Sequence, residues 1–164
     1  MDSIDKFNKL SKAEFISIFR NIFEKTEWIA ERCYESKPYN NLDELVSKMM
    51  KIFENIEKER HLEILNSHPD LAVEKKLTED SKNEQKNASL NQCADEEFVE
   101  FKKLNEEYKK KFGFPFIITV KGKNKEEILN SFRQRITNNI NLEFEEAKKQ
   151  VKKIANFRLS EIIK

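Results

Sequence analysis

The sequence has few of the residues that make tight turns, disulfides and phosphate-binding loops. Its 164 residues include only 2 Gly, 3 Pro and 2 Cys. Two glycines are too few for a Walker loop or a dinucleotide-binding loop, whose backbone must approach phosphate groups closely. Few turn residues also argue against a flexible linker, and the length suits a single domain. We therefore expect one domain over residues 1–164 and no nucleotide cofactor.

Potential metal ligands and membrane segments are equally scarce. His61 and His68 are the only histidines, so a three-histidine metal site is excluded, and neither lies in an HExxH pattern. Cys33 and Cys93 are isolated thiols without CxxC spacing, which favours a reducing compartment. No apolar run reaches the roughly 20 residues that cross a bilayer, and the start lacks signal-peptide regions. The sequence predicts a soluble, cytoplasmic protein without a metal ion and without a membrane partner.

Positive and negative charges are balanced. Lys and Arg total 31 against 30 Asp and Glu, and the two signs are mixed along the chain. Binding of nucleic acid requires a net basic face, so no nucleic-acid partner is expected. The 38% hydrophobic content includes 13 Phe, and a chain of this length can bury roughly two-thirds of its unfolded surface. A folded domain with a substantial core is therefore expected.

Apolar side chains recur at helical intervals through most of the chain. Ser11 and Glu14 have capping-box spacing, which predicts that a first long helix begins there. Asn41 is placed to open a second helix. A short helical run should end just before His68, because the residue that precedes a proline is disfavoured in helical conformation.

The second half of the chain shows the same helical pattern with one exception. Further helices are predicted from the capping-box spacing of Ser81 and Glu84 and from the apolar series 98–112, 128–136 and 144–162, with Gly113 as a C-terminal cap. The exception is residues 114–120, a β-branched and aromatic run that is too short for a helix, which we expect to be a buried extended segment. The predicted fold class is all-α, a single-domain bundle of about seven helices.

Three polar side chains are candidates for chemistry. A histidine at a helix end is usually an idle or hydrogen-bonded side chain, but its pKa near ~6.5 also suits His68 to proton transfer at neutral pH. Glu84 either caps its own helix or holds the His68 ring. Arg158 interrupts the apolar stripe of the last helix, so it should meet a carboxylate, either from this chain or from a ligand. The residues alone leave these alternatives open.

Several uncommon strings occur together in the order and spacing of one family. They are Ser67-His68-Pro69-Asp70-Leu71-Ala72, Ser81-Lys82-Asn83-Glu84-Gln85, Leu104-Asn105-x-x-Tyr108, Phe112-Gly113-Phe114-Pro115-Phe116, Val120-Lys121-Gly122 and Ile154-Ala155-x-x-Arg158-Leu159. In these strings the chain resembles the OHCU decarboxylases, where OHCU is 2-oxo-4-hydroxy-4-carboxy-5-ureidoimidazoline. The likeness covers essentially the whole chain. One departure is Ser89, which stands where the family commonly has glycine.

The resemblance implies an all-helical homodimer that needs no metal or organic cofactor. It further implies decarboxylation of OHCU to (S)-allantoin and carbon dioxide in urate breakdown. By resemblance, His68, Glu84, Gln85 and Arg158 line the substrate site. We expect His68 to act as general acid/base assisted by Glu84, and we expect Gln85 and Arg158 to hold the substrate. The other expected substrate-binding residues are Pro69, Ser81, Phe116, Ile117 and Ile118, the last three partly through backbone groups.

Two alternatives remain at this point. One is a non-enzymatic helical interaction module in which the aromatic residues 112–116 dock a partner. The other is a different cofactor-free reaction on a related ureido or imidazolone ring. Convergence of His68 and Glu84 with Arg158 on one cavity would favour an enzyme over an interaction module.

Overall fold

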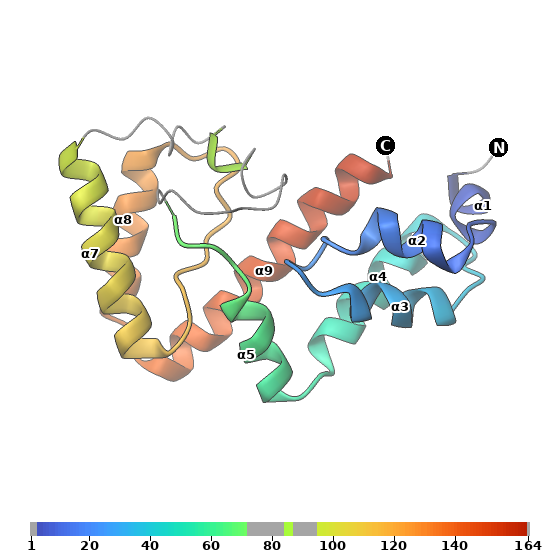
Figure 1. Ribbon diagram of the computed structural model, residues 1–164, viewed down its shortest axis with the longest axis horizontal. Coiled ribbons are helices and arrows are strands. Elements are labelled where there is room, and N and C mark those ends of the chain that lie inside the picture. Colours follow the sequence, from blue (N-terminus) through green and yellow to red (C-terminus); the bar gives the residue numbers. More distant parts are fainter. Residues whose placement is uncertain (1–2, 72–83, 87–94, 164) are drawn as a thin grey trace. The chain divides into compact units, whose positions relative to one another are not determined.

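The structure is a computed structural model that describes residues 3–71, 84–86 and 95–163 (Figure 1). Within these ranges the chain forms helices and no β-strand, which confirms the all-α prediction. The labelled helices are α1 Ser3–Asn8, α2 Lys12–Phe19, α3 Glu27–Glu35, α4 Leu42–Glu54, α5 Lys58–Asn66, α7 Asp95–Phe112, α8 Lys125–Arg135 and α9 Ile140–Ile162. Residues 84–86 are also helical. None of the described helices is long and apolar enough to span a membrane.

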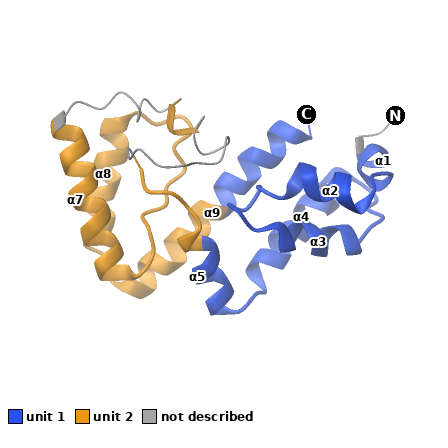
Figure 2. Ribbon diagram, viewed as in Figure 1, with its two compact units in different colours: residues 1–64, 152–164 blue, residues 65–151 orange. Residues whose placement is uncertain are grey.

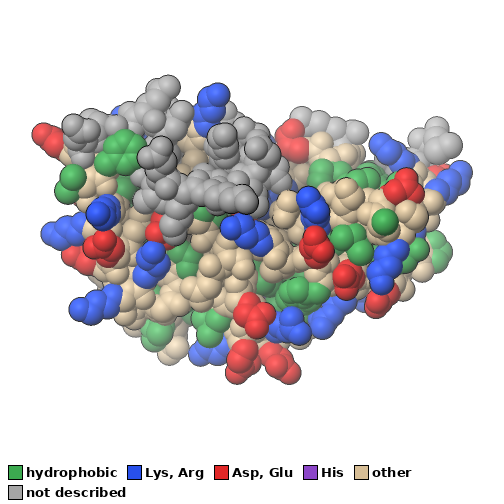
Figure 3. All heavy atoms as spheres, viewed as in Figure 1, with side chains coloured by type: hydrophobic (Ala, Val, Ile, Leu, Met, Phe, Trp, Pro, Cys, Tyr) green, Lys and Arg blue, Asp and Glu red, His purple; other side chains and the backbone are tan. Residues whose placement is uncertain are grey.

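The chain divides into two compact units (Figure 2). Unit 1 comprises Met1–Ile64 and Lys152–Lys164, and unit 2 comprises Leu65–Val151. Helix α9 contributes residues to both units, because the division falls between Val151 and Lys152. On the face shown in Figure 3, acidic and basic side chains are interspersed, as the balanced composition predicts.

Unit 1 begins with helices whose starts are fixed by local capping. The Ser11 hydroxyl accepts a hydrogen bond from the Glu14 backbone N–H, and the Glu14 carboxylate accepts one from the Ser11 N–H. These two bonds form the predicted capping box. The Asn41 side chain caps α4 in the same way, accepting from the Glu44 N–H at 2.8 Å. Both predicted helix starts are confirmed.

The predicted first long helix is wrong in its length. Helix α2 ends at Phe19, and the chain turns before α3 begins at Glu27. Lys25 within this turn has a φ of +55°, a left-handed conformation incompatible with a continuous helix. Ile22 and Phe23 are nevertheless buried, so the turn preserves the apolar spacing that suggested one helix. Burial rather than helical continuity explains the pattern.

The core of unit 1 is built around stacked aromatic rings. Phe23 stacks on Phe53 of α4 with ring centroids 4.8 Å apart. The His61 ring lies edge-on to Phe53, and its Nε2 is 2.7 Å from the Phe53 carbonyl oxygen. Residue 61 is therefore a buried, hydrogen-bonded core histidine.

Unit 2 is centred on Tyr108 of α7. Its ring is fully buried against the rings of Phe112, Phe114, Phe116 and Phe132. Helix α7 ends where expected: Gly113 has a φ of +81°, and its N–H donates to the Lys109 carbonyl. Residues 114–120 then form a buried segment that is neither helix nor strand, which agrees with the predicted exception to the helical pattern.

Candidate functional site

His68 lies in a turn directly after α5. The helix ends at Asn66, and the His68 N–H donates to the Leu65 carbonyl at 3.2 Å, which closes the turn. Pro69 follows and prevents the helix from continuing. The side chain of His68 is only 9% exposed. The sequence prediction that this histidine sits at a helix end is confirmed, and its burial places a titratable ring inside the protein.

Gln85 comes from a different part of the sequence to the same turn. Residues 84–86 are helical, and the Gln85 side chain is buried while Glu84 is half-buried. The Gln85 Nε2 donates to the Asp70 carbonyl oxygen at 3.3 Å. The structure thus brings Gln85 to the His68 turn, and its role in substrate binding stays a prediction. Contact between Glu84 and His68 stays a prediction, and Ser81 and Ser89 lie outside the described residues.

Helix α7 also holds this turn. Asn105 Nδ2 donates to the Leu71 carbonyl at 3.1 Å, and Lys109 Nζ lies 2.7 Å from Asp70 Oδ2. Neither α7 residue was predicted to have a role from the sequence. Asn105 belongs to the Leu104-Asn105-x-x-Tyr108 string, so the resemblance contained a signal for it. No signal in the sequence pointed to Lys109, because the run Lys109-Lys110-Lys111 looks like a solvated helix face.

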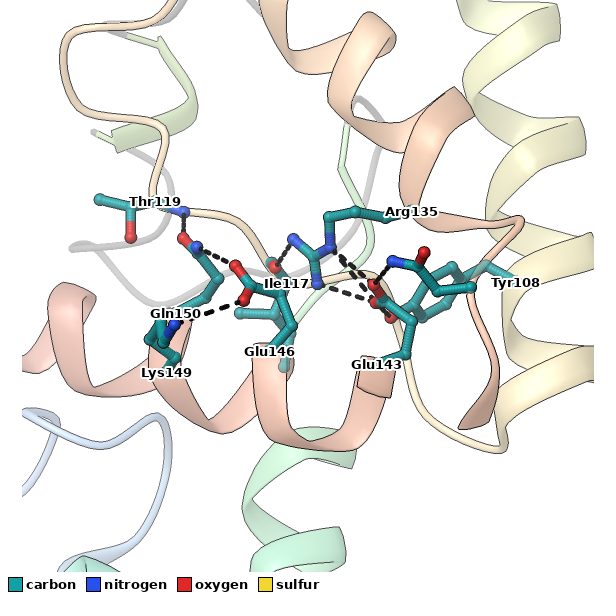
Figure 4. Close-up of polar contacts among 9 residues, drawn as sticks. Tyr108, Ile117, Thr119, Arg135, Glu143, Glu146, Lys149 and Gln150 are labelled. Atoms are coloured by element: carbon teal, nitrogen blue, oxygen red, sulfur yellow. Dashed lines mark hydrogen bonds and ion pairs between the residues drawn. The ribbon is translucent and has the colours of Figure 1, made fainter. Parts of the chain in front are cut away.

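Phe116, Ile117 and Ile118 are all buried within residues 114–120. Among the described residues, side chains and not another strand bond the backbone of Ile117 and Thr119 (Figure 4). Arg135 Nη1 donates to the Ile117 carbonyl at 2.7 Å, and Gln150 Oε1 accepts from the Thr119 N–H at 2.8 Å. Lys123 Nζ donates to the Thr119 carbonyl at 2.8 Å. Helices α8 and α9 therefore fix the backbone of the segment predicted to line the pocket.

A buried carboxylate, Glu143, organises the other side of this region. It accepts hydrogen bonds from the Tyr108 hydroxyl, from the Arg135 guanidinium at 3.0–3.2 Å and from Asn138 Nδ2 at 3.0 Å (Figure 4). Burial, followed by the hydrogen bond to Glu143, raises the pKa of the Tyr108 hydroxyl, so Tyr108 acts as a donor.

Sequence reasoning missed the Glu143 cluster, although a signal was present. Glu143 stands one helical turn before Ala147 on the apolar stripe of α9, and its side chain is fully buried. A charged residue on such a stripe needs a partner. The same criterion did single out Arg158. The partner of Glu143 is Arg135, whose guanidinium also lies over the Phe116 ring at 4.4 Å from the centroid.

Arg158 is a buried residue of unit 1 that is paired with a carboxylate of the same unit. Its Nη2 lies 2.8 Å from Glu24 Oε2, and its Nη1 donates to the Asn21 carbonyl at 2.8 Å. Both charged side chains are buried. Of the two partners expected for Arg158, the structure thus supplies a carboxylate from this chain. Contact with a ligand stays a prediction.

Among the described residues, no group of three or more His, Cys, Asp or Glu side chains is arranged to hold a metal ion. What the His68 turn offers chemically is one buried imidazole, next to a proline, on a turn whose carbonyl groups are held by Gln85 and Asn105. Such an arrangement suits proton transfer to and from a small molecule.

Comparisons with known proteins point in one direction. A family model described as OHCU decarboxylase matches residues 8–160. The chain is 39% identical to the uric acid degradation bifunctional protein of Bacillus sp. (strain TB-90), over 100% of this chain and 33% of that protein. It therefore spans about a third of that relative's length. It is 35% identical to the 2-oxo-4-hydroxy-4-carboxy-5-ureidoimidazoline decarboxylase of Haloferax volcanii, over 97% of this chain and 95% of the relative. A crystal structure of (S)-allantoin synthase matches with a TM-score of 0.80 at 27% identity, covering 100% of this chain and 54% of the other.

Proposed function

The chain belongs to the OHCU decarboxylase family, and on this premise we propose that it decarboxylates OHCU to (S)-allantoin and carbon dioxide. The observation that carries the proposal is the likeness over nearly the full length of both chains to the Haloferax volcanii decarboxylase. The buried His68 on its fixed turn supports it from the structure. We propose a single catalytic domain over residues 1–164 that works as a cytoplasmic homodimer.

The substrate supplies its own electron sink. When the bond between the hydroxylated ring carbon and the carboxylate breaks, carbon dioxide leaves and the bonding pair forms a double bond to the neighbouring ring carbon. The electrons of the adjacent C=N bond move to nitrogen, which takes a proton. The resulting enol then loses its hydroxyl proton as the carbonyl forms, while the neighbouring carbon gains a proton. Because no external sink is required, we propose that the reaction proceeds without an organic cofactor or metal.

His68 is the proposed general acid/base for these proton transfers. An imidazole exchanges protons near neutral pH, and a positioned general acid/base typically contributes ~10²- to 10⁴-fold in rate. Glu84 is proposed to orient the ring and to stabilise its charged form. Delivery of the final proton to one face of the ring would set the (S) configuration.

The remaining proposed residues bind the substrate. Gln85 fixes the ureido or ring amide groups, and Arg158 holds an anionic or carbonyl oxygen. A tight salt bridge to the departing carboxylate would stabilise the ground state and slow the reaction, so Arg158 is proposed to bind elsewhere on the ligand. Pro69, Ser81, Phe116, Ile117 and Ile118 complete the proposed pocket.

Turnover of freshly generated OHCU, followed by circular dichroism of the (S)-allantoin formed, tests the function. We expect the wild type to exceed the uncatalysed, non-stereoselective reaction and His68→Asn to lower kcat by ~10²- to 10⁴-fold. His61→Gln, which alters the other buried histidine, is the control and should retain activity below its melting temperature. Wild-type protein no faster than buffer would refute the function and favour an interaction module or another ring substrate. Near-normal turnover by folded His68→Asn would refute only the role of His68.

A further inference from the structure

We propose that Lys109 and Asn105 of α7 are positioning residues that hold His68 in its reactive orientation. The proposal rests on the proposed function of His68. It assigns a role to two side chains that act on the turn rather than on the substrate.

Asn105 and Lys109 lie on one face of α7 and bond to consecutive residues of the turn. Lys109 Nζ lies 2.7 Å from Asp70 Oδ2, and Asn105 Nδ2 donates to the Leu71 carbonyl at 3.1 Å. Asn105 and Lys109 are four residues apart on a helix, so their side chains lie on the same face. Asp70 and Leu71 follow His68 by two and three residues. One rigid helix therefore fixes the turn at two adjacent points.

Side chains from other segments of the chain bond to the backbone of the turn. Pro69 has no N–H to donate. The carbonyls of Asp70 and Leu71 accept hydrogen bonds from the side chains of Gln85 and Asn105. The path of the backbone after His68 is consequently held by side chains from other segments. A displacement of about 1 Å at a reacting group can lower the rate ~10²-fold.

Asn105 bonds to the His68 turn through one end of its buried amide. Its side chain is only 3% exposed, and its Oδ1 has no hydrogen-bond partner within the described part of the chain. A buried amide with an unpaired acceptor carries a desolvation penalty that an apolar residue would avoid. The hydrogen bond that Asn105 Nδ2 donates to the Leu71 carbonyl acts on the His68 turn.

Variants of Lys109 can separate an effect on the position of His68 from an effect on the stability of the protein. Its side chain is 41% exposed, and ion pairs with such exposure contribute little to the stability of a folded protein. Lys109→Met keeps much of the aliphatic length but removes the charge and the donor, whereas Lys109→Arg keeps both. Lys110→Met is the matched control, because Lys110 is the next residue on α7 and is exposed.

We expect Lys109→Met to lower kcat roughly 10- to 100-fold, with a smaller change in KM and a melting temperature within about 3 °C of wild type. Lys109→Arg should recover most of the kcat, and Lys110→Met should match wild type. Asp70→Asn should lower kcat similarly, and the double variant Asp70→Asn/Lys109→Met should be little worse than either single one, because both remove the same contact. Equal kcat for Lys109→Met and Lys110→Met would overturn the proposal. A loss of kcat that only follows a loss of folded protein would also overturn it.

A second measurement is independent of turnover. In the proton NMR spectrum, the titration of the His68 ring should shift in Lys109→Met and stay unchanged in Lys110→Met, with the His61 ring as internal reference. If the wild type fails to convert OHCU, the proposed function is wrong, yet this titration still tests whether Lys109 fixes the ring. An unchanged His68 titration in Lys109→Met would overturn the positioning role.

Discussion

Replacing Arg135 by Met should strongly destabilise unit 2, because it leaves a charged Glu143 without its cation. The Glu143 side chain is 0% exposed, and Arg135 approaches both of its oxygens at 3.0–3.2 Å. Removing one partner of a buried ion pair typically costs about 3–5 kcal/mol. The same change breaks the bond to the Ile117 carbonyl and the contact with the Phe116 ring. For a chain of this size, about 3–5 kcal/mol corresponds to a fall in melting temperature of roughly 6–20 °C.

The chain contains a matched control for this change. Arg133 lies on the same helix and forms a two-point ion pair with Glu100, at 2.5 and 2.7 Å, but its side chain is 48% exposed. Arg133→Met should therefore melt close to wild type, since exposed pairs add little. Melting curves and urea unfolding followed by circular dichroism compare the two variants.

A second variant tests the cause of the destabilisation. In Arg135→Met/Glu143→Gln the buried charge is gone, and the amide oxygen can still accept from one of the two donors, Tyr108 or Asn138, which bond to different oxygens of Glu143. This double variant should recover a substantial part of the lost stability. Equal destabilisation by Arg133→Met and Arg135→Met, or no recovery in the double variant, would refute the reasoning that an uncompensated buried charge is responsible.

Two further predictions concern unit 1. Arg158→Ala should lower the melting temperature, because it leaves the buried Glu24 without its cation. It should also lower kcat/KM for OHCU at temperatures where the variant is folded. Unchanged kinetics with a lower melting temperature would mean that Arg158 acts on stability alone. Burial raises the pKa of the Cys33 thiol from 9.0 to about 12, so in a Cys93→Ser background Ellman's reagent should react with folded protein far more slowly than with urea-unfolded protein. The contribution of this neutral thiol to stability should be present below pH 9 and lost as the pH rises towards 12, and Cys33→Ala should remove that dependence.

Features set by neighbours in sequence were predictable. The caps at Ser11, Asn41 and Gly113 each depend on residues within one helical turn, so the sequence pattern contains all the information needed. The position of His68 at a helix end followed from Pro69 for the same reason. The turn around Lys25 was missed because no Gly or Pro marks it and the apolar spacing continues across it.

Features set by tertiary contact were predictable only in part. The position of Arg158 on an apolar stripe showed that it needed a carboxylate, but Glu24 lies 134 residues away and nothing in the sequence identifies it. The bonds from Asn105 and Lys109 to the His68 turn span 34 and 39 residues. Which polar side chains of a helix reach a distant turn depends on packing, so these contacts emerge only from the structure.

Within the described part of the chain, residues 114–120 have no partner strand, and this has a consequence for aggregation. Within this segment, the Phe116-Ile117-Ile118-Thr119-Val120 stretch combines aromatic and β-branched residues with no charge and no proline, the composition of segments that pair edge to edge between chains. In the native protein, Arg135, Gln150 and Lys123 occupy backbone groups at Ile117 and Thr119 that another strand would otherwise bond. We expect these three polar side chains to act as gatekeepers from outside the segment, protecting against self-association a stretch that contains no gatekeeping charge of its own.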